Sequence, residues 1–289
     1  MPVIAVINRK GGSGKSTLAT HIATWCARQG HAVMLGDVDR QQSSRAWLRR
    51  RDESLPAISP WAMDQNVLRV PTGISHVVLD TPGGIHGFEL ARVVMAADAI
   101  VIPVCGSLFD RESAAACYAE LSGLPRVASG RCQVGVVGMR IDSSTRAVET
   151  LREWAQSLGL PFLGALRESQ LYVRIIDRGM TIFDLPPEQA TSQLEHWAPL
   201  LEWVARVMSP SARAETGAAR APGMRVAGSR NESLMPAQES LVHGGTRLGV
   251  LASARADAHR APLRTLARSA ALEVPQFLKS EIPQFLKRS

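Results

Sequence analysis

The sequence predicts an α/β fold, in which helices cover both faces of a doubly wound, mostly parallel sheet, followed by a tail of different composition. Three observations support this. Short apolar segments alternate with helix-like segments through residues 1–208, which requires parallel strands joined by right-handed crossovers. Hydrophobic residues make up 45% of the 289 residues, enough for a substantial core. After Met208 the composition turns to Ala, Arg, Ser and Gly.

The elements are expected in a regular order. Strands are expected at residues 3–7, 32–38, 76–80, 99–104, 134–139 and 162–166. Helices are expected at residues 18–29, 43–54, 111–121, 145–158, 172–178 and 191–208. Ile182 and Phe183 are expected in a short extended piece, and prolines break any long element in residues 55–73. Trp197 and Trp203 are expected to anchor the core.

The first strand runs into Asn-Arg-Lys-Gly-Gly-Ser-Gly-Lys-Ser-Thr at residues 8–17, and a helix follows. Strand, glycine-rich turn and helix together are the context of a phosphate-binding P-loop. The glycines let backbone N–H groups point at phosphate oxygens, Lys15 can reach the β- and γ-phosphates, and the Ser16 hydroxyl can bind Mg²⁺. We therefore predict ATP and Mg²⁺ as ligands of a P-loop NTPase. The predicted nucleotide-binding residues are Gly11, Gly12, Ser13, Gly14, Lys15, Ser16 and Thr17.

Carboxylates follow two further strands. Asp37 and Asp39 end the second expected strand, and one of them is expected to face the metal or the attacking water. Asp80 ends the strand at residues 76–80 and fits a Walker B carboxylate that holds Mg²⁺ directly or through water. Gly83 and Gly84 follow it, in a flexible turn suited to sensing the γ-phosphate.

A second lysine, Lys10, precedes the glycines, and this Lys-Gly-Gly-Ser-Gly-Lys-Ser form resembles the deviant Walker A box of the ParA/MinD family. The resemblance covers residues 1–208 and includes Asp80-Thr-Pro-Gly. It implies that Lys10 crosses to the nucleotide of a partner subunit in an ATP-bound homodimer. It also implies that Asp39 acts in hydrolysis, with Asp39 a further candidate metal ligand. Arg40 stands where the family has proline, which affects the local turn.

The resemblance extends to the second half of the chain. It places Met139 and Arg140 near the nucleotide base. Related ATPases bind DNA without sequence preference through basic residues in the stretch that here holds Arg167, Arg174 and Arg178. Phosphate contacts need only positive charge on one face. The alternative is an ordinary charged helix whose arginines pair with nearby carboxylates.

The distribution of charge and the cysteines indicate where the basic residues lie and in which cellular compartment the protein is expected. The tail, residues 209–289, carries ten Arg and two Lys against five Glu and one Asp, so +6 of the net +7 belongs to it. Arg49-Arg50-Arg51 is interpreted as a solvated helix end. The cysteines, Cys26, Cys105, Cys117 and Cys132, lack metal spacing and are interpreted as reduced thiols. With no signal peptide and no apolar run long enough to span a bilayer, the protein is expected in the cytoplasm. The DNA binding that the resemblance implies would associate it with the nucleoid.

The tail divides into two parts. Residues 209–269 lack aromatic side chains and are predicted to be a disordered basic linker, which either adds DNA affinity or is merely solvated. Residues 273–280 and 281–288 repeat Pro-Gln-Phe-Leu-Lys within residues 270–289, which favours a bivalent docking motif for a scaffold protein. A membrane-surface helix and a neutral duplication are the alternatives. Pro275 and Pro283 argue against one continuous helix.

These observations favour an ATPase switch that dimerises with ATP, binds DNA nonspecifically and segregates or positions a cargo. Intrinsic turnover is expected to be slow and to be stimulated by a partner protein. The alternatives are a membrane-associated MinD-like spatial regulator and an amide-forming ATPase on the same scaffold, for which no additional motif is seen.

Overall fold

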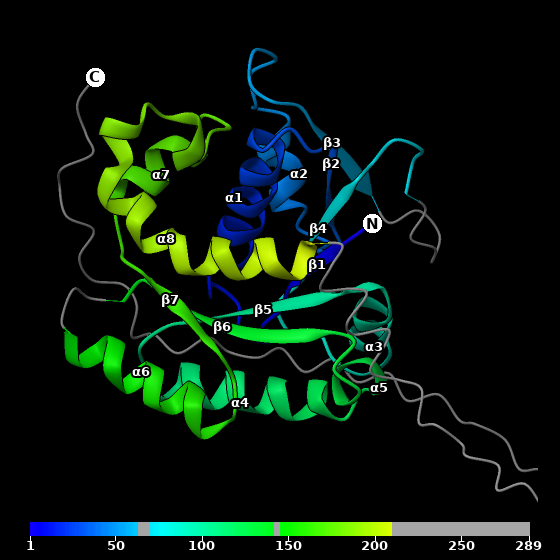
Figure 1. The fold of residues 1–289 in the computed structure, drawn as a ribbon, viewed down its shortest axis with the longest axis vertical. Helices are drawn as coiled ribbons and strands as arrows, with labels where there is room; N and C mark the ends of the chain where they lie inside the picture. The colour runs from blue at the N-terminus through cyan, green and yellow to red at the C-terminus, as the bar shows by residue number, and fades with distance from the viewer. Residues whose placement is uncertain (63–69, 142–144, 210–289) are drawn as a thin grey trace, which may run out of the picture. The chain divides into compact units, whose positions relative to one another are not determined.

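The computed structural model describes residues 1–62, 70–141 and 145–209 (Figure 1). The strands are β1 (Val3–Val6), β2 (Val33–Asp37), β3 (Ile58–Ala62), β4 (His76–Asp80), β5 (Ala99–Val104), β6 (Gln133–Met139) and β7 (Phe162–Leu166). The helices are α1 (Lys15–Arg28), α2 (Ser43–Leu48), α3 (Gly87–Ala96), α4 (Leu108–Ser122), α5 (Pro125–Ala128), α6 (Thr145–Ser157), α7 (Gln170–Ile176) and α8 (Pro187–Met208), with a 3-10 helix, η1 (Ile182–Asp184). The predicted linker after residue 209 and both octamers lie outside the described residues.

The strands form one sheet in the order β3-β2-β4-β1-β5-β6-β7, and every neighbouring pair is parallel. The predicted doubly wound parallel sheet is therefore confirmed. Because β4 lies between β1 and β2, Asp80 is in register with Val6 on one side and Asp37 on the other. The chain changes direction across the sheet at this point, and open α/β sheets bind ligands beyond the carboxyl ends of such strands.

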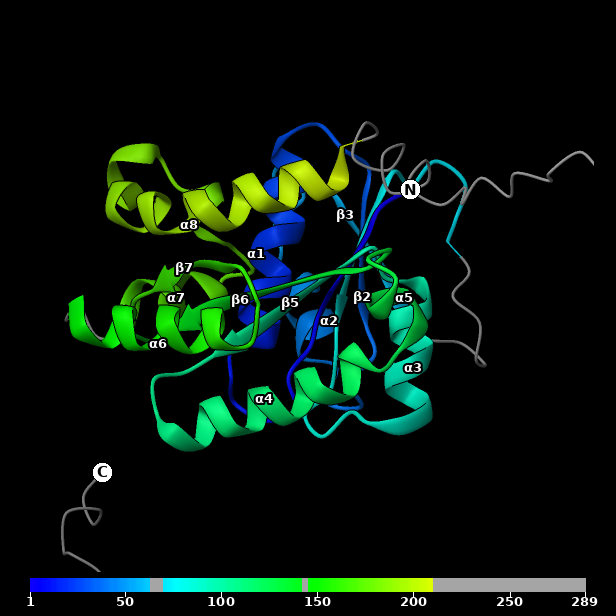
Figure 2. The ribbon, with the colours of Figure 1, turned by 60° about the horizontal axis from the view of Figure 1, so that its bottom comes forward.

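Helices cover both faces of the sheet. Helices α1, α2, α7 and α8 lie on one face, and α3, α4, α5 and α6 on the other (Figures 1 and 2). Side chains alternate along β1, so that Ile4 belongs to the first core cluster and Ala5 to the second. Trp197 and Trp203, the predicted core tryptophans on α8, are buried in the first cluster. Among the described helices, none is long and apolar enough to cross a membrane.

Several segments differ from the sequence-based expectation. Helix α2 ends at Leu48, although a helix was expected through residue 54. Ile182 and Phe183 were predicted to be extended, but they lie in η1, because Asp184 accepts hydrogen bonds from the backbone N–H and hydroxyl of Thr181 and bends the chain into a capped turn. Strand β3 forms within the proline-containing stretch. Pro60 is compatible with it because β3 is the edge strand, where a missing N–H leaves no neighbour unpaired.

Candidate functional site

The loop between β1 and α1 has a conformation that requires glycine. Gly12 and Gly14 have φ values of 71° and 94°, in the left-handed region that side chains rarely adopt. A Cβ on Gly14 would also lie 2.6 Å from the terminal methyl carbon of Met139. Gly14 is the N-cap of α1, so the loop ends directly at the N-terminus of this helix. Unpaired backbone N–H groups and the helix dipole favour an anion there.

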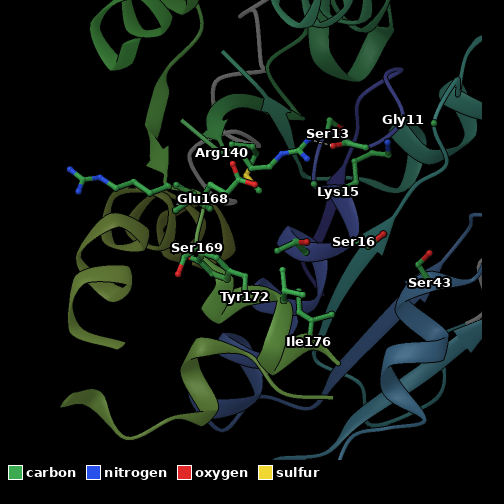
Figure 3. Close-up of a pocket in the computed structure, with 18 of the residues that line it drawn as sticks. Gly11, Ser13, Lys15, Ser16, Ser43, Arg140, Glu168, Ser169, Tyr172 and Ile176 are labelled. Atoms are coloured by element: carbon green, nitrogen blue, oxygen red, sulfur yellow. Dashed lines mark hydrogen bonds between the residues drawn. The ribbon is translucent and has the colours of Figure 1, made fainter. Parts of the chain in front are cut away.

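A cavity of about 850 Å³ opens over this loop. The predicted nucleotide-binding residues that line it are Gly11, Gly12, Ser13, Gly14, Lys15, Ser16, Thr17, Met139 and Arg140. Asp39 also lines it. Figure 3 shows the loop residues on one side of the cavity and Glu168, Ser169 and Tyr172 on the other. The cavity is of a size that holds a small-molecule ligand.

Lys15 lies at the bottom of the loop and is buried. Its Nζ donates a hydrogen bond to the carbonyl of Lys10 at 3.0 Å. Burial lowers the pKa of Lys15, and the charges of Asp80 and Asp39 act in the opposite direction. Lys15 is thus a cation held between the loop and two carboxylates, which suits it to bind a phosphate group.

Asp80 has a carboxylate oxygen without a partner. Its side chain is buried, Oδ2 accepts a 2.6 Å hydrogen bond from the Ser44 hydroxyl, and Oδ1 has no hydrogen-bond partner in the described structure. Burial raises the pKa of Asp80 to about 6, although the hydroxyls of Ser44 and Ser16 oppose that shift. An unpaired buried carboxylate oxygen is costly unless a cation or donor meets it. Asp80 and Ser16 therefore fit a Mg²⁺ ion.

The protein groups alone do not make a complete metal site. Nowhere in the described ranges do three His, Cys, Asp or Glu side chains gather to hold a metal ion. Mg²⁺ is commonly held by one or two protein oxygens together with substrate phosphates and water. The donor set of Ser16 and Asp80 matches that arrangement.

The two carboxylates after β2 have different surroundings. Asp37 is buried: Oδ1 accepts the N–H of Asp39 and Oδ2 the N–H of Arg45, each at 3.0 Å, and burial raises its pKa. Asp39 is half-buried, lines the cavity and accepts the N–H of Gln41 at 2.9 Å. Asp37 thus holds the turn and the start of α2, and Asp39 is the one of the pair that faces the cavity.

The turn after β4 packs against the glycine-rich loop. The N–H of Gly84 donates to the carbonyl of Arg9 at 2.6 Å. A Cβ on Gly83 would lie 3.3 Å from the Cα of Gly11, and Gly83 lines the cavity. A conformational change in either segment would therefore reach the other.

Lys10 makes contacts on the α4 side of the loop. Its Nζ forms an ion pair with Asp110, in the first turn of α4. Its backbone N–H donates to Oδ1 of Asn8 at 2.9 Å, and the Asn8 amide donates to the carbonyl of Pro103 at 2.6 Å. The Lys10 side chain is 41% exposed, so it is accessible from solvent although it is paired.

The lining of the cavity is partly aromatic. Tyr172 and Trp197 line it, and the indole N–H of Trp197 donates to the Tyr172 hydroxyl at 2.9 Å. Arg140, with φ of 51°, donates from its guanidinium to the Gly12 carbonyl and reaches the Cys105 sulfur at 3.4 Å. Met139 and Arg140 thus line the cavity against the glycine-rich loop, and their contact with the base stays a prediction.

The three arginines predicted to bind DNA lie on different segments. Arg167 lines the cavity, whereas Arg174 lies on α7 and Arg178 follows that helix. All three are exposed, and none forms an ion pair with another residue of the described ranges. The alternative of an ordinary charged helix with paired arginines is not favoured by these contacts.

Sequence reasoning missed several groups at the site. Ser44 contacts Asp80, which is 36 positions away in the sequence, and no spacing pattern predicts such a contact. Asn8 is the first residue of the loop at residues 8–17 but was given no role, although a polar side chain immediately after an apolar strand was an available signal. Tyr172 was included only in a helix, and its place in the cavity depends on the packing of α7 against α8.

Comparison with known proteins agrees with this geometry. Residues 4–182 match the model of the CobQ/CobB/MinD/ParA nucleotide binding domain. The chain is 39% identical over 106 residues to maintenance of carboxysome distribution protein A of Gloeobacter kilaueensis, covering 35% of this chain and 48% of that protein, which is about half its length. It is 24% identical over 189 residues to the protein of the same name from Halothiobacillus neapolitanus, covering 63% and 87%. A putative plasmid partition protein of Borrelia burgdorferi bound to AMPPNP shares the fold, with a TM-score of 0.54, 16% identity and coverage of 71% and 98%.

Proposed function

The chain belongs to the CobQ/CobB/MinD/ParA nucleotide-binding family, and on that premise we propose that it is an ATPase switch that dimerises with ATP, binds DNA nonspecifically and positions or segregates a cargo. The cargo is a plasmid, a chromosome region or a protein assembly, and the relatives named for plasmid partition and carboxysome distribution support both kinds. One observation carries the proposal. The carboxyl ends of β1, β2 and β4 bring Lys15, Asp39 and Asp80 around one glycine-rich loop.

The loop N–H groups and Lys15 hold the phosphates of ATP. Ser16 and Asp80 hold Mg²⁺, with Asp80 acting directly or through water and Asp39 as a further candidate ligand. When bound, Mg²⁺ neutralises negative charge on the phosphate oxygens. Met139 and Arg140, which line the same cavity, contact the base.

Hydrolysis depends on two further tasks. Asp39 places the attacking water, and Lys15 stabilises the charge that develops on the transferred phosphate. The half-buried Asp39 carboxylate at the cavity wall supports the first task, and the buried Lys15 ammonium supports the second. Turnover is slow in the isolated protein and is raised by a partner protein.

ATP bridges two subunits, and each Lys10 crosses to the nucleotide of the other. The exposure of Lys10 supports this role. In the single subunit its ammonium group is engaged with Asp110, so dimerisation exchanges that carboxylate for phosphate oxygens of the partner's nucleotide.

The dimer binds DNA through Arg174 and Arg178, in the cytoplasm and on the nucleoid. Their exposure without an ion pair in the described structure supports phosphate contacts. Arg167 is the weaker candidate of the three, because it lines the nucleotide cavity.

The test is binding of the full-length protein to random-sequence duplex DNA with ATP and with ADP. We expect tight binding only with ATP, and at least tenfold weaker binding for Arg174→Ala/Arg178→Ala. The ten arginines of the tail are intact in this variant. Binding that ignores both the nucleotide and the variant would show attraction of the tail to a polyanion, and would contradict the switch.

A further inference from the structure

The end of α2 is hydrogen-bonded to the segment that follows α7, although 128 positions separate Arg51 from Gly179. The indole N–H of Trp47 donates to the carbonyl of Met180 at 3.4 Å. The Arg51 guanidinium donates to the carbonyl of Gly179 at 3.3 Å and to both carboxylate oxygens of Asp184 at 2.8 and 3.0 Å. This buried bidentate ion pair fixes one segment against the other.

The contact between the two segments is backbone on backbone. Gly179 has a φ of 70°, and a Cβ there would lie 2.4 Å from the carbonyl carbon of Arg50. The residue before this glycine, Arg178, is therefore held beside Arg50 in space. Helices α2 and α7 lie on the same face of the sheet, with α1 between them (Figure 1).

Exposed arginines flank this junction on both segments. Arg51 was predicted to lie in a solvated helix end, but its side chain is only 5% exposed, because the Asp184 carboxylate binds it. Its neighbours Arg49 and Arg50 are exposed, as are Arg174 and Arg178. None of these four exposed arginines forms an ion pair within residues 1–62, 70–141 and 145–209.

Three exposed carboxylates are close in sequence to these four arginines. Asp52 and Glu53 follow the α2 arginines, and Asp177 precedes Arg178. The Asp52 carboxylate accepts hydrogen bonds from the N–H and hydroxyl of Ser54, which engages it within its own turn. Four exposed arginines against three exposed carboxylates leave one net positive charge at the junction. Asp184 does not reduce it, because that carboxylate is paired with Arg51.

We infer that Arg49 and Arg50 form, together with Arg174 and Arg178, one composite surface that contacts the phosphates of duplex DNA. The inference rests on the proposed function and enlarges its DNA site from one helix to two elements. Unpaired exposed guanidinium groups are suited to phosphate, which they bind with paired N–H donors. The buried Arg51–Asp184 pair fixes the relative position of the two halves.

Helix α2 also connects this surface to the nucleotide site. At its start, Ser44 donates to Asp80, and the Arg45 N–H donates to Asp37. At its end lie the two exposed arginines. A change at the Asp80 carboxylate therefore has a route of only six helical residues to the surface.

The experiment uses the full chain, a random-sequence duplex and a nonhydrolysable ATP analogue with Mg²⁺, with Kd measured at several salt concentrations. Arg49→Ala/Arg50→Ala should weaken binding about tenfold or more and reduce the slope of log Kd against log salt by about two. The matched control is Arg131→Ala/Arg206→Ala, which removes the same charge from exposed positions on other elements and should leave both quantities nearly unchanged. Thermal unfolding and ATP-dependent dimerisation of each variant report on folding.

Three outcomes would overturn the inference. In the first, Arg49→Ala/Arg50→Ala binds DNA as tightly as the control, while Arg174→Ala/Arg178→Ala binds weakly. This result would restrict the surface to α7 and leave the proposed function standing. Absence of DNA binding by the wild-type protein in every nucleotide state would remove the proposed function as well. Loss of binding to anionic phosphatidylglycerol vesicles in Arg49→Ala/Arg50→Ala, with unchanged DNA affinity, would assign the surface to a membrane.

Discussion

Lys10 and Asp110 form an ion pair within one subunit, which joins the glycine-rich loop to the first turn of α4. Asp110 is also part of the helix cap, where its Oδ2 accepts a 2.5 Å hydrogen bond from the Ser107 hydroxyl. Burial alone would raise the pKa of Asp110, but the hydrogen bonds from Lys10 and Ser107 outweigh it and lower the pKa. The carboxylate is therefore charged at neutral pH and competes with any other anion for Lys10.

Removing that competition should favour the dimer. We expect Asp110→Asn to tighten dimerisation with a nonhydrolysable ATP analogue about two- to fivefold, in line with a partly exposed ion pair. Sedimentation equilibrium measures the effect, and the double variant with Lys10→Ala is the control, in which Asp110→Asn should change nothing. An unchanged or weaker dimer for Asp110→Asn alone would show that this contact does not restrain Lys10.

Lys15→Ala should abolish the response to nucleotide. The buried ammonium group of Lys15 is the cation at the bottom of the loop, so its loss should weaken ATP binding at least about 100-fold. Isothermal titration measures this, and Lys10→Ala is the matched control, which should bind ATP as a monomer within about twofold of wild type but dimerise poorly. Equal dimerisation by Lys10→Ala and wild type would remove the role of Lys10 in the partner site.

Asp39→Ala should hold the protein in its ATP-bound dimer. Loss of the group that places water should lower the hydrolysis rate at least about 100-fold and leave ATP affinity nearly intact. Asp39→Asn separates chemistry from structure, because its side-chain oxygen can still accept the Gln41 N–H. Both variants should be slow and dimeric, and normal turnover in either would exclude Asp39 from catalysis.

Ser44→Ala should weaken Mg²⁺ binding at the site, although Ser44 is not one of the predicted nucleotide-binding residues. The Ser44 hydroxyl orients Asp80 through a 2.6 Å hydrogen bond, so its removal should raise the Mg²⁺ concentration for half-maximal ATPase activity about tenfold. Its neighbour Ser43, which is exposed and lines the cavity, provides the control Ser43→Ala. The same Mg²⁺ dependence in both variants would mean that Asp80 needs no such support.

The sheet was predictable because its signals are local. Strands buried on both faces are continuous apolar runs, and the glycine-rich loop fixes the chain direction at β1. Helix α3 was missed because the apolar run at residues 93–105 contains both the end of this helix and the next strand. The helix ends at Ala96, and β5 begins at Ala99. Helix α4 begins at Leu108, earlier than predicted, because Ser107 and Asp110 cap each other.

The site was predictable only where one short segment carries it. The loop at residues 8–17 and the carboxylates that end β2 and β4 were found because each directly follows a strand. The partners that hold them come from distant segments: Ser44 for Asp80, and Asp110 for Lys10. Such pairs follow from the strand order, in which β4 inserts between β1 and β2 and β5 lies on the other side of β1. Hydrophobic periodicity contains no information on that order.

His21 is a buried, neutral group whose titration should destabilise the fold in acid. It is stacked on Trp197, with ring centroids 4.9 Å apart. Its Nδ1 lies 2.7 Å from the Thr17 carbonyl and its Nε2 accepts the Ile182 N–H at 3.4 Å, which together require the neutral tautomer with the proton on Nδ1. Burial lowers the pKa of His21 to about 4, although the Thr17 hydrogen bond and the charge of Asp184 oppose the shift.

Between pH 6.5 and about 4, the unfolded chain binds a proton at this histidine that the folded protein does not. The contribution of His21 to the free energy of unfolding should therefore be fully present above pH 6.5. The free energy of unfolding should fall by about 2–3 kcal/mol as the pH drops to 4.5. Urea unfolding of the nucleotide-free protein across this range measures the slope. His21→Phe should lose that part of the slope whatever its stability at pH 7, whereas His196→Gln, at a half-exposed histidine of α8, should keep it. If His21→Phe keeps the wild-type slope, other groups cause the acid sensitivity, and His21 is not the buried base that the contacts indicate.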